Sequence, residues 1–213
     1  MKLILLAAAL AVSLTSAGCE RATVVEKQSV SAQPSEAGSE ARQQTMNNQN
    51  STATSGIRFV VDRSDRAVYV QRGNVAFRKH PVAVGKPEHE TPTGSWSISK
   101  VDLNPEWIPP DSDWVKDRSR KAPGDPNNPM GRARLIFDPP YSIHGTDALD
   151  SLGSAESHGS IRVANAHVVE LARLVVKAGG KWEGDAWFNA RLNDRTKMTE
   201  TKLDRSIPIE VRP

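Results

Sequence analysis

Two short segments of the sequence carry residue types that could perform acyl transfer. They are Ser142-Ile-His-Gly-Thr146 and Ser157-His-Gly-Ser-Ile-Arg-Val163. Side chains alternate along a strand, so an extended second segment would place His158, Ser160 and Arg162 on one face. A hydroxyl beside an imidazole is the usual signature of an activated nucleophile, because the imidazole can take the hydroxyl proton.

The first segment adds another histidine, His144, which directly precedes a glycine at the end of an apolar run. If the two strands are neighbours, His144 and His158 can both converge on Ser160. Single histidines in strands often have only a structural role, and that alternative stays open at this point. A metal site needs three or four protein ligands, and neither histidine has a carboxylate or cysteine at a ligand-like spacing. We therefore expect no metal and no other cofactor.

The elements that must position these residues are mostly strands. Short β-branched and aromatic runs, separated by turn residues, predict a mainly antiparallel sheet. The runs are 57–61, 67–70, 75–77, 82–84, 95–99, 134–137 and 207–211. Apolar residues at helical spacing predict one helix, with Asn165 as its N-cap and Gly179-Gly180 at its end. A second, weaker helix is predicted near 186–192. The expected fold is mainly β with one or two helices, an antiparallel sandwich or barrel.

One long segment, from Asp102 to Gly131, has no hydrophobic periodicity and is rich in Pro, Asp and Trp. Loops of this length are uncommon inside compact domains and often act as lids or binding loops. The sequence alone does not separate that interpretation from a partly disordered insertion.

The 213-residue chain opens with features of an export signal. Residues 1–18 combine Lys2, a short apolar run and small residues, as secretory signal peptides do. The following Cys19 is the only cysteine, and Ser16-Ala17-Gly18-Cys19 resembles a lipobox, which predicts lipidation and a membrane anchor. A plain cleaved signal with an incidental cysteine is the alternative. Residues 19–56 are polar and predict a disordered tether, which leaves 57–213 as the folded domain.

Composition excludes several classes of function. A single cysteine permits no disulfide within the chain, and it leaves the predicted domain without a thiol. The net charge of +3 arises from mixed signs throughout, so nothing favours nucleic acid as a partner.

The chain resembles the L,D-transpeptidases with a YkuD-type catalytic domain, and the resemblance extends from Ile57 to Val211. It rests on sequence blocks that occur in the family's order and spacing. The blocks are Gly85 with Thr91-Pro-Thr-Gly94, Asn104-Pro-Glu-Trp-Ile-Pro-Pro110, Asn128-Pro-Met-Gly131, Ile143-His-Gly-Thr146, Gly153 and Ser157-His-Gly-Ser-Ile-Arg162.

The resemblance implies a β-rich catalytic fold whose partners are peptidoglycan stem peptides, on the periplasmic side of the envelope. In this family a cysteine attacks the carbonyl of the third stem residue, expels D-alanine and passes the acyl group to an amine or to water. By position, His144 matches the general base and the backbone at Gly145 orients it. Ser160 stands where the cysteine is expected.

Four further residues match substrate-binding positions of the family. His158 and Gly159 correspond to the substrate and oxyanion side, and Arg162 to the polar residue beyond the nucleophile. Trp107 belongs to the loop that flanks the cleft. These roles are implied by the resemblance.

Serine at position 160 changes the chemistry that the resemblance implies. A cysteine supplies some thiolate at neutral pH, whereas a serine hydroxyl must lose its proton as it attacks. Three interpretations remain open: an active transpeptidase or carboxypeptidase that uses Ser160, a catalytically silent relative that binds stem peptides, and a laboratory Cys-to-Ser variant. The retained His144 and Arg162 favour activity.

Overall fold

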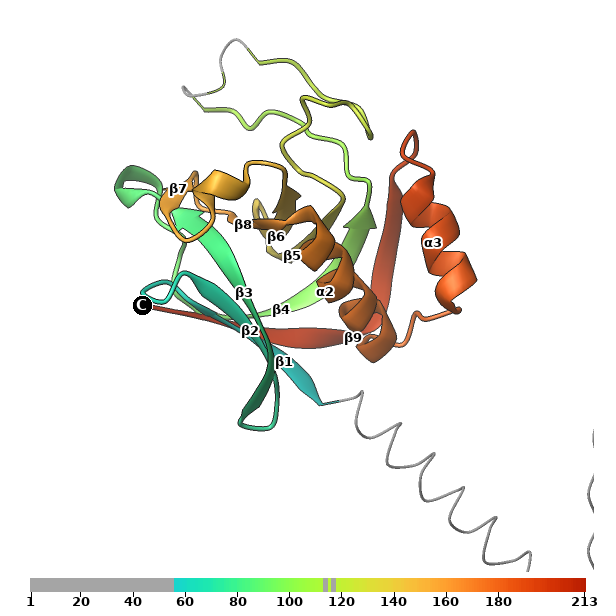
Figure 1. Ribbon diagram of the computed structural model, residues 1–213, viewed down its shortest axis with the longest axis horizontal. Helices are drawn as coiled ribbons and strands as arrows, with labels where there is room; N and C mark the ends of the chain where they lie inside the picture. The colour runs from blue at the N-terminus through green and yellow to red at the C-terminus, as the bar shows by residue number, and fades with distance from the viewer. Residues whose placement is uncertain (1–55, 113–114, 116–117) are drawn as a thin grey trace, which may run out of the picture. The chain divides into compact units, whose positions relative to one another are not determined.

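The computed structural model describes residues 56–112, 115 and 118–213. The predicted signal peptide, Cys19 and all of the predicted tether except Gly56 lie outside the described residues. The described part of the chain forms nine strands, two helices and the short 3-10 segments η1 and η3 (Figure 1). In chain order these are β1 Ile57–Asp62, β2 Ala67–Arg72, β3 Val75–Gly85, η1 Pro87–His89, β4 Gly94–Leu103, β5 Ala133–Asp138, β6 Tyr141–Thr146, η3 Leu149–Ser151, β7 Ala155–Ser157, β8 Ile161–Ala164, α2 Asn165–Ala178, α3 Asp185–Asn193 and β9 Thr199–Arg212.

All nine strands belong to one sheet, in the order β2-β1-β9-β4-β5-β6-β8-β3-β7, and an additional β2–β3 pairing closes it. Strand β3 makes closure possible, because residues 75–81 pair with β2 whereas Val82 and Ala83 pair with β8. Neighbouring strands are antiparallel except for β1 with β9, β6 with β8 and β3 with β7. The prediction of a mainly β, barrel-like fold with one or two helices is confirmed.

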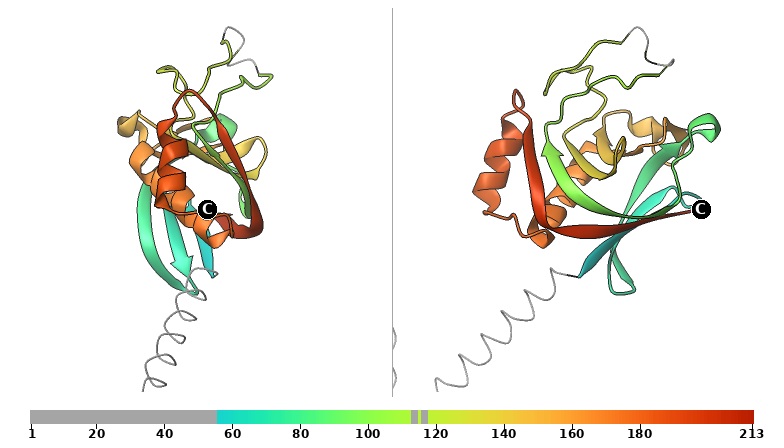
Figure 2. Two further views of the ribbon diagram at one scale, coloured as in Figure 1. Left: turned by 90° about the vertical axis from the view of Figure 1, so that its right-hand side faces the viewer. Right: turned by 180° about the vertical axis from the view of Figure 1, so that it is seen from behind.

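Helix α2 covers the core face of the sheet. It contacts β4, β5, β6, β8 and β9, and the views of Figures 1 and 2 agree in placing it across these strands. Its apolar stripe, which includes Val168, Leu171 and Val175, is wholly buried. Side chains of β5 alternate between the two faces of the sheet, so that Leu135 faces the core while its neighbour Arg134 points to the other face. That other face carries the cleft described below.

Strands β3 and β9 differ most from the strands that the sequence predicts. Residues 75–77 and 82–84 were expected as separate strands, yet β3 runs through Pro81 without a break. Pro81 lies where β3 changes partner from β2 to β8, a position at which a missing N–H is tolerated. Strand β9 begins at Thr199 rather than at 207, because its polar first half pairs with β4.

The helix prediction was right in extent and wrong about the cap. Ala164 is the N-cap of α2 and Asn165 is the first helical residue. The Asn165 side chain instead ties the helix to two loops, since its Oδ1 accepts from the Arg132 N–H at 2.8 Å and its Nδ2 donates to Asp147 at 2.7 Å. The second predicted helix is α3.

The described part of the long predicted loop follows β4 and is anchored at both ends. Buried Asn104 adopts a positive φ of 46° and donates through Nδ2 to carbonyl oxygens at the end of α3, including that of Leu192 at 3.0 Å. Near the other end, Asn128 Nδ2 donates to the carbonyl oxygens of Pro105 and Ala122. Trp107 and Lys121 form an isolated antiparallel bridge between the two arms.

Candidate active site

A cleft of ≈ 600 Å³ lies between this loop and the face of the sheet opposite the core. Strand and turn residues form one wall, and loop residues such as Trp107 and Met130 form the other. Its polar lining combines cations, imidazoles and hydroxyls. These polar groups are Lys100, Arg118, Arg134, Arg162, His89, His144, His158, Tyr141, Ser112, Ser142, Ser157 and Ser160.

A single row of paired residues crosses the floor of this cleft. Asp102 on β4 is opposite Arg134 on β5, Arg134 is opposite His144 on β6, and His144 is opposite Arg162 on β8. Directly paired residues share a face of the sheet, so this register places the imidazole of His144 between two guanidinium groups. Strand β6, which carries His144, and strand β8, which carries Arg162, are parallel neighbours in the sheet.

His144 is buried, with 3% of its surface exposed. Its Nδ1 lies 2.9 Å from the carbonyl oxygen of Gly145. A carbonyl only accepts, so Nδ1 carries the proton of the neutral ring and Nε2 holds the lone pair. Burial lowers the pKa of His144 to about 4; the backbone carbonyls of Gly145 and Pro129 oppose this shift, and the guanidinium groups of Arg162 and Arg134 add to it. At neutral pH the ring is therefore uncharged and able to accept a proton.

Gly145 must be a glycine for this arrangement to exist. A Cβ at this position would collide with Oδ1 of Asn165 and press on Val168 of α2. The same Asn165 oxygen binds the backbone before β5. The absence of a side chain at Gly145 thus lets α2 approach the strand that carries His144.

Ser160 follows a tight turn rather than lying within a strand. We expected 157–163 to be extended, and this was wrong for residues 158–160, because β7 ends at Ser157 and β8 begins at Ile161. Gly159 has a φ of +102°, and a Cβ there would lie 2.5 Å from Cε1 of Tyr141. The Ser157 hydroxyl holds the turn together, since it donates to the carbonyl of Ser160 and accepts from the Gly159 N–H at 3.1 Å.

This turn places the Ser160 hydroxyl next to β6, the strand that carries His144. Ser160 Oγ accepts a hydrogen bond from the backbone N–H of Ser142 at 3.3 Å. Ser142 and His144 are two residues apart on the same face of β6, and both Ser160 and His144 line the cleft. The N–H of Gly159, which the resemblance places on the oxyanion side, is bound to Ser157.

The remaining predicted residues also line the cleft. The His158 ring packs against that of His89, with 5.0 Å between centroids. Burial lowers the pKa of His158, and Lys86, His89, Arg162 and Arg118 lower it further. Arg162 is half-buried and makes no hydrogen bond or ion pair within the described part of the chain. Trp107 is buried in the wall formed by the loop.

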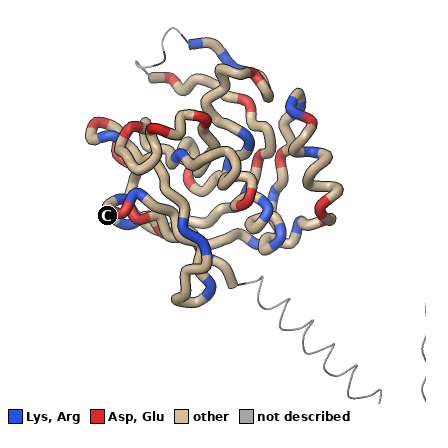
Figure 3. The backbone as a smooth tube through the Cα atoms, in the orientation of Figure 1, with Lys and Arg blue, Asp and Glu red and all other residues tan. Residues whose placement is uncertain are grey.

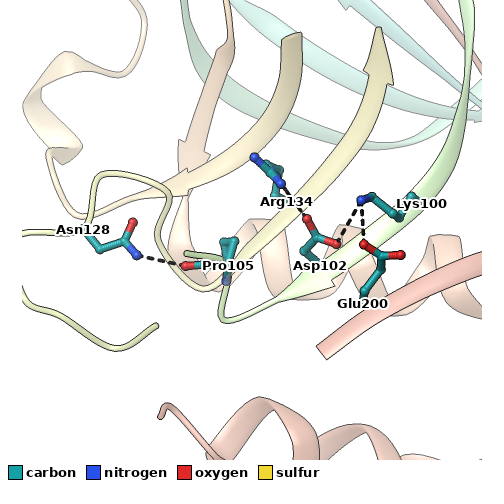
Figure 4. A network of polar contacts seen from close by, with 6 residues as sticks. All are labelled: Lys100, Asp102, Pro105, Asn128, Arg134 and Glu200. Carbon is teal, nitrogen blue, oxygen red and sulfur yellow. Dashed lines mark hydrogen bonds and ion pairs between the residues drawn. The ribbon is translucent and has the colours of Figure 1, made fainter. Parts of the chain in front are cut away.

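Sequence reasoning missed Arg134 and the ionic network behind it (Figure 4). Arg134 donates from Nε and Nη2 to Oδ2 of Asp102, at 3.2 and 2.7 Å. Asp102 is wholly buried, and its other oxygen lies 4.0 Å from Lys100 Nζ, which also binds Glu200 at 2.7 Å. The available signal was the spacing of Ala133, Leu135 and Phe137 at every second position, which assigns the intervening Arg134 to the face away from the core.

Charges of both signs are spread along the rest of the backbone (Figure 3). Within the described residues, no group of three or more His, Cys, Asp or Glu side chains is arranged to hold a metal ion. No helix in that part of the chain has the length and apolarity needed to span a bilayer.

Comparisons with known proteins identify relatives of one kind. The chain is 24% identical over 168 residues to the probable L,D-transpeptidase ErfK/SrfK of Salmonella typhimurium, which covers 70% of this chain and 54% of the relative. It is 33% identical over 103 residues to the putative L,D-transpeptidase YkuD of Bacillus subtilis, covering 48% and 50%. The chain thus spans about half the length of these curated relatives.

A solved structure, L,D-transpeptidase 3 from Mycobacterium tuberculosis, superimposes with a TM-score of 0.46 and 17% identity, covering 74% of this chain and 61% of that one. The family model of the L,D-transpeptidase catalytic domain matches residues 56–196, from the first described residue to the segment before β9. The chain therefore belongs to the YkuD family of L,D-transpeptidase catalytic domains.

Proposed function

We propose that this chain is a peptidoglycan L,D-transpeptidase in which Ser160 is the nucleophile and His144 the general base. What supports the proposal is that buried His144 and the Ser160 hydroxyl line one cleft, and that Ser160 Oγ binds the backbone of Ser142, two residues before His144 on β6. A weak nucleophile next to a base that is itself oriented by a third group is the arrangement that acyl transfer requires. Here the third group is the carbonyl of Gly145.

In the first half-reaction, Ser160 Oγ attacks the carbonyl carbon of the third stem residue, and its proton passes to Nε2 of His144. The tetrahedral adduct collapses, the C–N bond to D-alanine breaks, and His144 returns the proton to the leaving amine. The product is an ester between Ser160 and the donor. The Ser142 N–H supports this step, because a hydrogen bond to the serine oxygen favours its charged form.

In the second half-reaction, His144 takes a proton from the acceptor as the acceptor attacks the ester, and the Ser160 oxygen leaves with that proton. An amine of another stem or an anchored protein gives transpeptidation, and water gives carboxypeptidation. His158, Gly159 and Trp107 would bind the donor, and Arg162 would bind a donor carboxylate. Arg162 makes no hydrogen bond or ion pair within the described residues, although the Glu156 carboxylate acts on it at longer range, and a half-buried guanidinium of this kind favours an anion.

A catalytically silent relative that binds stem peptides is the second candidate. The pKa of about 4 at His144 favours it, because a general base is most effective when its pKa lies near the working pH. A cleft shaped for the longer bonds of sulfur would also misplace a hydroxyl, and a misplacement of about 1 Å can cost about a hundredfold in rate.

The two candidates are separated by incubating the purified chain with tetrapeptide-bearing muropeptides and analysing protein and products by mass spectrometry. Transpeptidase or carboxypeptidase activity predicts an acyl-enzyme, loss of D-alanine or new cross-links in the wild type, and none of these in Ser160→Ala. Products that persist in Ser160→Ala would remove Ser160 as the nucleophile. If the wild type is inert and Ser160→Cys reacts, the protein is a catalytically silent relative.

We also propose that the protein is exported and anchored to a membrane of the envelope. The segment 1–18 would direct export, Cys19 would carry a lipid, and 19–56 would tether the domain on the periplasmic side of the envelope. These assignments rest on the residue pattern of the first 56 positions. Mass analysis of the mature N-terminus tests them, and a cleaved chain without acyl groups on Cys19 would remove the anchor.

A further inference from the structure

The β2–β3 hairpin carries positive charge without negative charge. Residues 66–87 contain five Lys or Arg residues and no Asp or Glu (Figure 3). Arg72 and Lys79 form no ion pair within the described residues, although acidic side chains at the β1–β2 turn act on Lys79 at longer range. Arg78 is paired with Glu170 of α2. The described part of the chain therefore neutralises the hairpin only in part.

The tip of this hairpin is exposed and partly apolar. Residues 72–76 are all exposed, and Val75, at 71%, is the most exposed large hydrophobic side chain among the described residues. The Phe77 ring contacts two guanidinium groups, with its centroid 5.1 Å from Cζ of Arg72 and 5.7 Å from Cζ of Arg78. Cations around an apolar tip suit the surface of an anionic membrane, because the headgroups attract the cations and the boundary of the acyl chains accepts the apolar side chain.

The folded domain begins beside this tip. Ile57, the first residue of β1, is paired with Arg72, so the chain enters the domain next to the hairpin (Figure 1). The segment 20–56, which connects Cys19 to β1, can span at most about 130 Å, whatever its conformation. An anchor at Cys19 would keep the tip close to the membrane and so raise its effective concentration there.

The tip and the cleft lie at opposite ends of the domain. Strand β3 begins at Val75 in the tip and ends at Gly85, about 33 Å further along if it is fully extended. The next segment, η1, contributes His89 to the cleft. Figures 1 and 2 agree in placing the hairpin and the loop beside the cleft at opposite ends. This arrangement favours a membrane over peptidoglycan as the partner of the tip, since the polymer would bind at the cleft.

We propose that the β2–β3 hairpin docks the domain on an anionic phospholipid surface, with Val75 at the apolar boundary and Arg72 and Lys79 facing the lipid phosphates. Docking directs the cleft away from the membrane, toward the polymer. The inference goes beyond the proposed function of the cleft, and it rests on the proposed export and anchor. A cation near such a surface strengthens binding about fivefold, so two cations give about thirtyfold.

Vesicles that carry the protein at one fixed attachment test the docking. Cys19 is the only thiol, so the full chain is coupled there to a maleimide lipid. The vesicles consist of phosphatidylcholine alone or of phosphatidylcholine and phosphatidylglycerol in equal parts. Hydrogen–deuterium exchange of residues 72–77, measured by mass spectrometry, gives the ratio of docked to free domain. We expect this ratio to be about five- to thirtyfold higher on the anionic vesicles at low salt, and to fall as salt screens the charges.

Two double variants with the same loss of charge assign the docking to the hairpin. Arg72→Gln/Lys79→Gln should remove the difference between the two kinds of vesicle. Arg195→Gln/Lys197→Gln, at exposed positions between α3 and β9, is the matched control and should retain it. Val75→Ser should weaken docking on anionic vesicles while leaving its salt dependence in place, because it removes only the apolar contact. Urea unfolding of each variant verifies that the domain stays folded.

The outcomes separate this inference from the proposed function. Equal exchange of residues 72–77 on both kinds of vesicle, or a difference that persists in Arg72→Gln/Lys79→Gln, would overturn the docking. Protection of these residues by purified peptidoglycan sacculi but not by vesicles would assign the tip to the polymer and overturn it as well. Muropeptide turnover by the uncoupled protein tests the cleft separately, and the hairpin variants should leave this turnover unchanged.

Discussion

The titration of His144 should make folding sensitive to acid. Burial lowers the pKa of His144 to about 4 in the folded state, whereas the pKa of the unfolded side chain is 6.5. The Gly145 carbonyl opposes this shift, and the guanidinium groups of Arg162 and Arg134 add to it. Between these values the unfolded state binds a proton that the folded state does not. The titration of His144 therefore does not lower the free energy of unfolding above about pH 6.5, and it lowers this free energy progressively as the pH drops toward 4.

The size of the effect follows from the displacement of the pKa. At 1.36 kcal/mol per unit, the full shift corresponds to about 3 kcal/mol. Between about pH 7.5 and about pH 5, the linkage relation gives a loss of about 2 kcal/mol from this residue alone. Most carboxylates remain ionised over that interval, so they contribute little to the change.

The assay is urea unfolding of the wild type and of His144→Gln at both pH values. We expect the wild type to lose about 2 kcal/mol more than the variant on acidification, whatever the difference between them at pH 7.5. Burial also lowers the pKa of His80, but His80 is present in both proteins and cancels in the comparison. Equal losses in the two proteins would show that His144 does not have a depressed pKa in the folded state.

Three substitutions test the local geometry around the cleft. Gly159→Ala should destabilise by about 1–3 kcal/mol and abolish acyl-enzyme formation, because φ is +102° and the new Cβ meets Tyr141; unchanged unfolding and acylation would contradict this. Gly145→Ala should cost about 1–3 kcal/mol by overpacking against Asn165, and pairing it with Asn165→Ala should recover part of that loss in denaturant titrations. Asn104→Ala should lower the free energy of unfolding by about 2 kcal/mol, because it removes the hydrogen bonds to carbonyl oxygens at the end of α3. Asn193→Ala, at an exposed position, is the control. Equal effects of the two substitutions would show that Asn104 does not anchor the loop.

The strands that the sequence predicted correctly are those with a local hydrophobic signal. Strand β5 alternates core and cleft residues, and β1 is almost continuously apolar because it is buried on both faces. The strand boundaries that were missed have non-local causes. The first half of β9 is polar and extended because β4 pairs with it, and β3 continues through Pro81 because it has two different partners. No window of sequence contains those pairings.

The candidate site was predicted as a set of residues but not as a geometry. His144, Ser160, His158, Arg162 and Trp107 all line one cleft. These residues are not brought together by a strand through Ser160, however, because residues 158–160 form a turn that depends on a positive φ at Gly159. The partnership of Arg134 with Asp102 was inaccessible as well, because it depends on the register between β4 and β5.

In the proposed mechanism, the charges around His144 are compatible with a serine nucleophile. A thiolate mechanism begins from an ion pair, yet an imidazolium at His144 would be buried between Arg134 and Arg162. A serine needs the opposite, an uncharged imidazole that accepts a proton only during attack. In the proposed mechanism, a donor carboxylate bound at Arg162 would offset the charge of this guanidinium and raise the pKa of His144. The base would then gain strength when the donor occupies the cleft, which links substrate recognition to the activation of Ser160.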